Sequence, residues 1–167
     1  MTVALAFYKG KGNFLDRAIR LVTGSQYSHV EYIQNVEDID PEGCHECWSS
    51  SPRDGGVRNK RIALIQSHWD VVKIDFLKTD RRYLFEWKIV GGYDYLGIIL
   101  NHFFAFHRQH HKRWFCSEII AFAIGIPNSE IYSPGTLKEL VEEVNEIVSR
   151  KYADGIDVGK KIGLKNV

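Results

Sequence analysis

The sequence has few cysteines, almost no net charge and no long hydrophobic segment, and each absence argues against a class of protein. Three cysteines in 167 residues do not suggest a disulfide framework, which favours a reducing compartment. A net charge of +1 argues against a general nucleic-acid-binding protein, whose surface is strongly basic. The longest apolar run, Ile119–Ile126, is far shorter than the ~20 residues that cross a bilayer.

The beginning of the sequence also lacks the pattern of an export signal. No basic region precedes the apolar stretch Val3–Tyr8, and this stretch is too short for the core of a signal peptide. We therefore expect a cytoplasmic protein with no stable insertion in a membrane.

What is present is the composition of one folded domain. The chain is 44% hydrophobic and 13% aromatic, which is enough to form a core. Its length lies within the range of about 100–200 residues that is common for one domain. We expect a single domain over residues 1–167, with a loosely held tail from about residue 154. The acidic stretch Glu31–Cys47 and the basic run His107–Arg113 (HRQHHKR) are interpreted as solvated loops.

The apolar patterning predicts an α+β fold. Asn13 and Gly24 predict the two ends of a first helix whose apolar face is formed by Phe14, Ala18, Leu21 and Val22. Further helices are predicted at Tyr93 to about His107, at Phe115 to Ile124, and from Pro134 through LKELVEEVNEIVSRK, whereas Tyr83–Val90 is ambiguous. Strands are predicted at Val3–Tyr8, Tyr27–Ile33, around Glu46–Ser51, at Val57–Ile65 and at Trp69–Phe76.

The strongest candidate for chemistry is Cys116, at the start of the predicted helix FCSEIIAFAIG and directly after the basic run. A thiol at a helix N-terminus lies at the positive end of the helix dipole, and basic neighbours favour its ionised form. The thiolate is the form that nucleophilic catalysis needs. A small buried core residue is the alternative interpretation.

A nucleophilic cysteine needs a base, and His29 in the strand YSHVE is the natural candidate. Glu31 lies two residues further along, on the same strand face, where it could orient the imidazole. Glu46 and Ser49 on the neighbouring strand are the other candidates for this orienting role. Tyr27 is also predicted on the His29 face and is a candidate for contacting substrate. An ordinary hydrogen-bonded histidine is the alternative for His29.

The residues around His29 and Cys116 together resemble a known family. The segment SQYSHVE follows a helix ending in TG, and WFCSEIIAFA lies far downstream. This order is similar to the permuted NlpC-like papain superfamily, which includes YiiX-type proteins and the lecithin:retinol acyltransferase branch. The resemblance covers roughly Asp16 to Ala123. It includes SSSPRDGGVRNKRI, similar to the strand and turn after the histidine strand, and YDYLGI at Tyr93–Ile98.

The resemblance implies a permuted papain-like α+β domain, with a central antiparallel sheet packed against helices. Cys116 would be the nucleophile, at a helix N-terminus, and His29 the general base. The family's third polar residue comes from the strand after the histidine, where no residue here matches the usual glutamate or histidine. Glu31, Glu46 and Ser49 therefore all stay open. Ser117, in the motif CSE, is carried over as a second candidate for contacting substrate.

The implied activity is that of a thiol hydrolase. A cysteine peptidase or amidase would cleave an amide bond, such as that of a cell-wall peptide, or an ester, through a thioester on Cys116. No cofactor and no nucleic acid are expected; the partner is a peptide or lipid acyl substrate. A phage origin would suit a cell-wall substrate for a chain without a signal peptide. The alternatives are a lipid acyltransferase of the same fold and a non-enzymatic binding module that retains it.

A zinc site is the weaker alternative for the other two cysteines. Cys44 and Cys47 form a C-x-x-C pair that encloses His45. Structural zinc takes four ligands, usually from two such pairs, and no second half-site with a recognised spacing is present. We therefore predict no metal.

Overall fold

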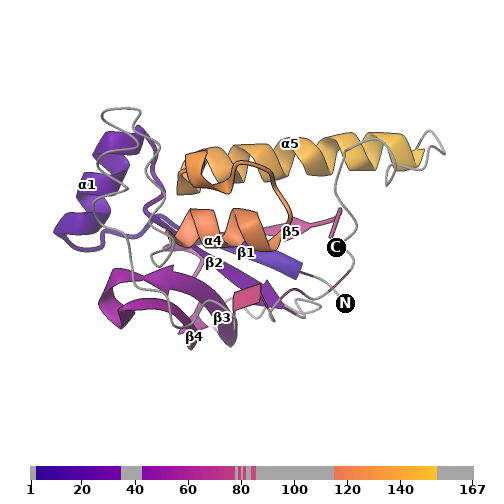
Figure 1. Cartoon of the computed structure of the whole chain (residues 1–167). Coiled ribbons are helices and arrows are strands. Elements are labelled where there is room, and N and C mark those ends of the chain that lie inside the picture. The colour runs from indigo at the N-terminus through magenta and orange to yellow at the C-terminus, as the bar shows by residue number, and fades with distance from the viewer. Residues whose placement is uncertain are drawn as a thin grey trace.

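A computed structural model describes residues 3–34, 43–77, 79, 81, 84–85 and 115–153. This part of the chain is α+β, as predicted, with three α-helices and a five-stranded antiparallel sheet in the order β4-β3-β2-β1-β5 (Figure 1). The strands are β1 (Val3–Tyr8), β2 (His29–Gln34), β3 (Cys44–Ser51), β4 (Gly56–Ala63) and β5 (Trp69–Ile74), and the helices are α1 (Phe14–Thr23), α4 (Cys116–Ala123) and α5 (Pro134–Ala153).

The inner strand β1 shows why the sheet separates two environments. It pairs along its whole length with β2 on one side and β5 on the other, and Val3 to Phe7 are all buried. Because successive side chains of a strand point to opposite faces, Leu5 packs in the larger core and Ala6 in a smaller one. The larger core includes Ile119 of α4 and Leu137 of α5, so these helices cover one face of the sheet (Figure 1).

Helix α1 has the predicted ends but a different buried face. The Asn13 side chain accepts a hydrogen bond from the Asp16 N–H, the Asp16 carboxylate accepts one from the Asn13 N–H, and Gly24 ends the helix in the left-handed conformation. The prediction that Phe14 and Leu21 pack inward is wrong, because these side chains are 86% and 85% exposed. The buried residues of α1 are instead Ile19 and Asp16. The Asp16 carboxylate also accepts hydrogen bonds from Ser28 and Arg53, which keeps this face of the helix turned inward.

Helices α4 and α5 begin where the sequence predicts. The carboxylate of Glu118 accepts a hydrogen bond from the Phe115 N–H at 3.2 Å and so closes the first turn of α4. The Ser133 hydroxyl accepts one from the Thr136 N–H at the start of α5. Leu137 and Val141 are fully buried, as the helical spacing predicts. Neither these helices nor any other in the described residues is long and apolar enough to cross a membrane.

The connection between β3 and β4 is the turn predicted from PRDGG. It forms a short 3-10 helix, η1 (Pro52–Asp54), and Gly55 follows with a φ of 82°, a conformation that side chains with a Cβ seldom adopt. Predicted strand ends differ from the observed ones by one or two residues. The predictions for Tyr93–His107, for the basic run His107–Arg113 and for the tail from residue 154 concern segments outside the described residues.

Candidate active site

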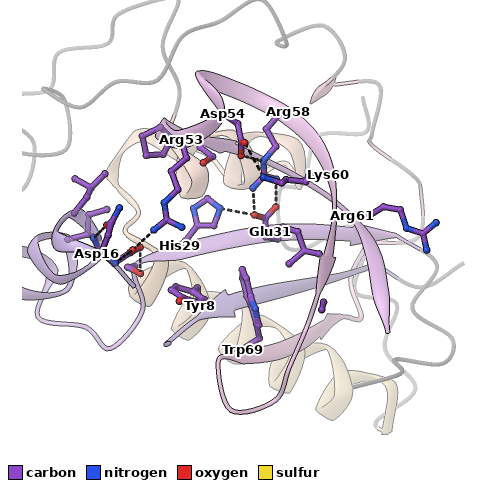
Figure 2. Close-up of a pocket in the computed structure, with 18 residues that line it drawn as sticks. Tyr8, Asp16, His29, Glu31, Arg53, Asp54, Arg58, Lys60, Arg61 and Trp69 are labelled. Carbon is purple, nitrogen blue, oxygen red and sulfur yellow. Dashed lines mark hydrogen bonds and ion pairs between the residues drawn. The ribbon is translucent and has the colours of Figure 1, made fainter. Parts of the chain in front are cut away.

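His29 and Glu31 lie side by side at the beginning of β2. Because they are two residues apart in a strand, both point to the face of the sheet opposite Val30. The His29 Nε2 atom is 2.7 Å from Glu31 Oε1 (Figure 2). The His29 side chain is 15% exposed and that of Glu31 is 0% exposed. The carboxylate therefore holds the imidazole from within the protein, and the ring lies near the surface.

Arg58 of β4 binds the other side of the Glu31 carboxylate. Its two terminal nitrogens lie 2.6 Å from Oε2 and 2.5 Å from Oε1, a bidentate ion pair (Figure 2). Arg58 Nε donates to the Asp54 carboxylate of η1 at 3.0 Å, and Lys60 Nζ lies 3.1 Å from that Asp54 carboxylate. Glu31 is therefore bound by two cationic groups, His29 and Arg58, and Asp54 in the turn after β3 binds Arg58 in turn.

Cys116 is the first residue of α4, and its side chain interacts with the His29 imidazole. The residue is 3% exposed, and α4 packs against β2 and β3. Burial by itself lowers the pKa of His29. Charge interactions with Cys116 and Glu31, and side-chain hydrogen bonds to both, outweigh burial and raise this pKa to about 10. The arrangement thus favours the imidazolium form of His29 beside the Glu31 carboxylate.

Glu31 is ionised although it is fully buried. Burial alone would raise the pKa of its carboxyl group, but hydrogen bonds from Arg58 and the positive charge of His29 hold this pKa below its ordinary value. A carboxylate in this state keeps its negative charge next to the imidazole throughout the neutral pH range.

The other two candidates for the orienting residue bond elsewhere. Glu46 is exposed and accepts a hydrogen bond from the Asn59 amide on β4. Ser49 is fully buried, and its hydroxyl donates to the Val30 carbonyl at 2.6 Å. Of the three candidates, the structure brings only Glu31 into contact with His29 within the described residues.

Tyr27 does not share the face of His29, so this prediction is wrong. β2 begins at His29, and the strand alternation therefore does not extend back to Tyr27. The Tyr27 ring packs edge-to-face against Phe7, with ring centroids 5.8 Å apart, in the core covered by α4 and α5. Its hydroxyl donates to Asp70 at 2.6 Å; burial and this bond raise the pKa of Tyr27 to about 12.

Ser117, the second candidate for contacting substrate, is 3% exposed. Its hydroxyl donates to the Tyr132 carbonyl at 2.6 Å, which ties α4 to the segment before α5. Ser117 follows Cys116 in the chain, but its hydroxyl makes a structural hydrogen bond to the backbone.

A pocket of about 400 Å³ opens beside His29 and Glu31. Arg53 of η1 lies at its rim near His29, and Tyr8 and Trp69 approach it from β1 and β5 (Figure 2). Charged side chains from α1, β2, η1 and β4 also line it: Asp16, Glu31, Arg53 and Arg58.

The two other cysteines are placed differently from each other. Cys44 is exposed and Cys47 is buried, because residues three apart in a strand point to opposite faces. Burial and then the charge of Glu31 raise the pKa of the Cys47 thiol. Across the described ranges, no group of three or more His, Cys, Asp or Glu side chains is arranged to hold a metal ion.

Arg58 is the site residue that the sequence did not single out. Its neighbours in RNKR are also polar, so nothing local distinguishes it. Its contact with Glu31 depends on the pairing of three strands, which no local pattern encodes. The only local signal is Asp54, four residues earlier, with which it forms an ion pair.

No protein-family model matches this sequence, and no curated protein matches it either.

Proposed function

We propose that this protein is a cysteine-dependent acyl hydrolase, a peptidase or amidase of permuted papain-like fold. The observation that carries the proposal is Cys116, at the N-terminus of α4, next to a histidine that Glu31 holds at 2.7 Å. The chain order, with the histidine strand before the cysteine helix, agrees with the order in the permuted NlpC-like superfamily that the sequence resembles.

The orientation of the ring supports this assignment. Glu31 engages Nε2 of His29, so Nδ1 is the nitrogen that remains for the thiol. A fixed tautomer and ring position are what a general base needs, and a buried carboxylate supplies them in other catalytic triads. In this proposal Cys116 is the nucleophile, His29 the general base and acid, and Glu31 the orienting residue.

The reaction follows from these roles. The Cys116 thiolate attacks the acyl carbon, and the negative charge moves to the carbonyl oxygen, where backbone N–H groups at the start of α4 stabilise it. The C–N or C–O bond then breaks as His29 gives its proton to the leaving group, which leaves a thioester on Cys116. His29 next takes a proton from water, the hydroxide releases the acid, and the thiolate and imidazolium are restored.

The walls of the pocket combine charged groups with apolar side chains such as Leu15, Ile19 and Trp69. Arg53, Asp54 and Lys60 contribute charged groups to it, and these suit a polar substrate with hydrogen-bonding groups along its backbone. We therefore place amide hydrolysis of a peptide first and take cell-wall peptides as the first substrates to test.

The test uses the reactivity of Cys116, with Cys44 as an internal control. We expect iodoacetamide at pH 7 to alkylate the buried Cys116 faster than the exposed Cys44, as measured by peptide mass spectrometry over time. His29→Ala should abolish this advantage, and a substrate mixture of cell-wall peptides and activated esters should give a thioester detectable by intact mass. A Cys116 that reacts more slowly than Cys44 in the native protein would contradict the proposal.

A further inference from the structure

Glu31, Ser49 and Arg58 lie in one row across three neighbouring strands. Ser49 of β3 is paired directly with Arg58 of β4. The pairing of Tyr32 with Trp48, continued by one residue, brings Ser49 opposite Glu31. Partners in an antiparallel pair share a face of the sheet, so all three side chains point to the same side. Arg58 therefore reaches Glu31 across the intervening strand, over Ser49.

Arg58 can reach Glu31 because the residue between them, Ser49, is small. Neighbouring strands lie about 4.8 Å apart, so Arg58 and Glu31 start from backbones separated by roughly twice that distance. Both side chains are long enough to meet, provided that nothing bulky stands between them. The Ser49 hydroxyl bonds the Val30 carbonyl, which keeps it close to the backbone and leaves the space above it to Arg58.

The charges along this row alternate in sign. From the turn after β3 inward they are Asp54, Arg58, Glu31 and the His29 imidazolium, and Cys116 is the next partner of His29. Glu31 and His29 are close enough to compete for one proton. The two N–H groups of Arg58 bind Glu31 in its ionised form and so oppose transfer of that proton to the carboxylate.

Other ionisable groups near His29 are engaged elsewhere or lie further along the pocket. Tyr8 of β1 is its cross-strand neighbour, and Asp16 of α1 and Arg53 of η1 line the same pocket. Asp16 and Arg53 bind each other at 2.6 Å. Among the residues that the structure describes, the imidazole therefore interacts with Glu31 and Cys116.

We propose that Arg58 is a positioning residue for the Cys116–His29 pair, acting through Glu31, and that the small side chain of Ser49 makes this contact possible. The inference rests on the proposed function for its catalytic consequence. Its structural part concerns only where the proton between Glu31 and His29 resides, and this part can be measured without a substrate.

The main test is Arg58→Met, compared with Arg61→Met on the same strand. Arg61 is exposed and hydrogen bonds the Cys44 backbone carbonyl instead of a carboxylate. We expect Arg58→Met to lower the pKa of His29, followed by NMR of its ring, by about one unit or more, and to slow alkylation of Cys116 at pH 7 about tenfold. Arg58→Lys should restore part of the loss, because it keeps the charge but not the bidentate bond. Arg61→Met should change neither quantity.

Two further comparisons keep the inference testable if Arg58→Met alone fails to fold. In Glu31→Gln, the added change Arg58→Met should have no further effect on the His29 titration, because the carboxylate through which Arg58 acts is gone; additive effects would overturn the inference. Ser49→Val should reproduce the effect of Arg58→Met, because the larger side chain fills the space between Arg58 and Glu31. Ser49→Ala should leave the His29 titration as in the unmodified protein. A His29 pKa unchanged by both Arg58→Met and Ser49→Val would also overturn it.

Failure of this inference can be told apart from failure of the proposed function. If Cys116 shows no enhanced reactivity in the unmodified protein, the hydrolase proposal fails, and the NMR titration still decides the link between Arg58, Glu31 and His29. If Cys116 is reactive in a His29-dependent way but the Arg58 and Ser49 variants titrate normally, the hydrolase proposal stands and the role of Arg58 is rejected.

Discussion

The two faces of β2 differ in how they are held, although their residues alternate along one strand. Val30 and Tyr32 are fully buried in an apolar core covered by α4 and α5. Glu31, between them, is equally buried on the other face, but among charged groups. The apolar face depends on packing without voids, whereas the ionic face depends on each charge keeping its partner. Burial alone therefore does not tell which kind of substitution a position tolerates.

The two faces meet at His29. His29 is the first residue of β2 and so lies at the end of the strand. Its ring interacts with Glu31 on the ionic face and with Cys116 of α4, the helix that covers the apolar face. In the proposed mechanism the apolar core sets the position of the nucleophile, and the ionic row sets the protonation of the base.

The largest expected effect is on the ionic face. Glu31→Ala leaves Arg58 and His29 without their shared carboxylate, so we expect the free energy of unfolding at pH 7 to fall by about 3–5 kcal/mol in urea denaturation. Glu46→Ala, an exposed glutamate on the next strand, is the matched control and should cost about 0.5 kcal/mol or less. Similar losses for the two variants would mean that the buried charges do not differ from surface charges.

On the apolar face, Leu5→Ala should lower the free energy of unfolding by about 2–5 kcal/mol, because it opens a cavity in the core. Leu5→Met, which keeps the volume, should cost less than about 1.5 kcal/mol. The control is Leu21→Ala on α1, where an 85% exposed side chain should contribute about 0.5 kcal/mol or less. Equal losses for Leu5→Ala and Leu21→Ala would show that α1 is packed in a different orientation.

The pH dependence of stability separates the two faces, because His29 and Glu31, whose pKa values are shifted in opposite directions, both lie on the ionic face. His29 has a pKa raised from 6.5 to about 10, so its stabilising contribution is complete below about pH 6.5 and is lost as pH rises toward 10. We expect a slope of up to about 1.4 kcal/mol per pH unit in this window, measured by urea denaturation, and a flatter curve for His29→Ala. Glu31, whose pKa is lowered, contributes in the opposite direction: its stabilisation is present above pH 4.5 and is lost in acid.

The smallest expected effect concerns Tyr27, which lies in the apolar core. Tyr27→Phe removes the hydrogen bond to Asp70 and should cost about 1 kcal/mol of stability. The rate at which Cys116 is alkylated should stay the same, because Tyr27 packs against Phe7 rather than against His29. A large fall in that rate would place Tyr27 at the reactive centre after all.

Most of the secondary structure could be predicted because its signals are local. Asn13 and Gly24 encode the ends of α1 through their own side-chain and backbone chemistry, and the spacing of Leu137 and Val141 encodes the buried face of α5. The buried face of α1 could not be predicted from hydrophobicity, since Asp16 turns inward to bonds made by Ser28 and Arg53, which come from later segments.

Local patterns in the sequence predict the α+β class, the strands and helices that the structure describes, and the pair of candidates Cys116 and His29. These follow from periodicity, from caps and from the chemistry of a thiol at a helix N-terminus, all of which act over a few residues. Which of Glu31, Glu46 and Ser49 contacts His29, and that Arg58 binds Glu31, became apparent only from the tertiary structure. The physical reason is that the register of β2, β3 and β4 sets which side chains meet across the sheet, and register arises from the pairing of whole strands rather than from the residues of any one of them.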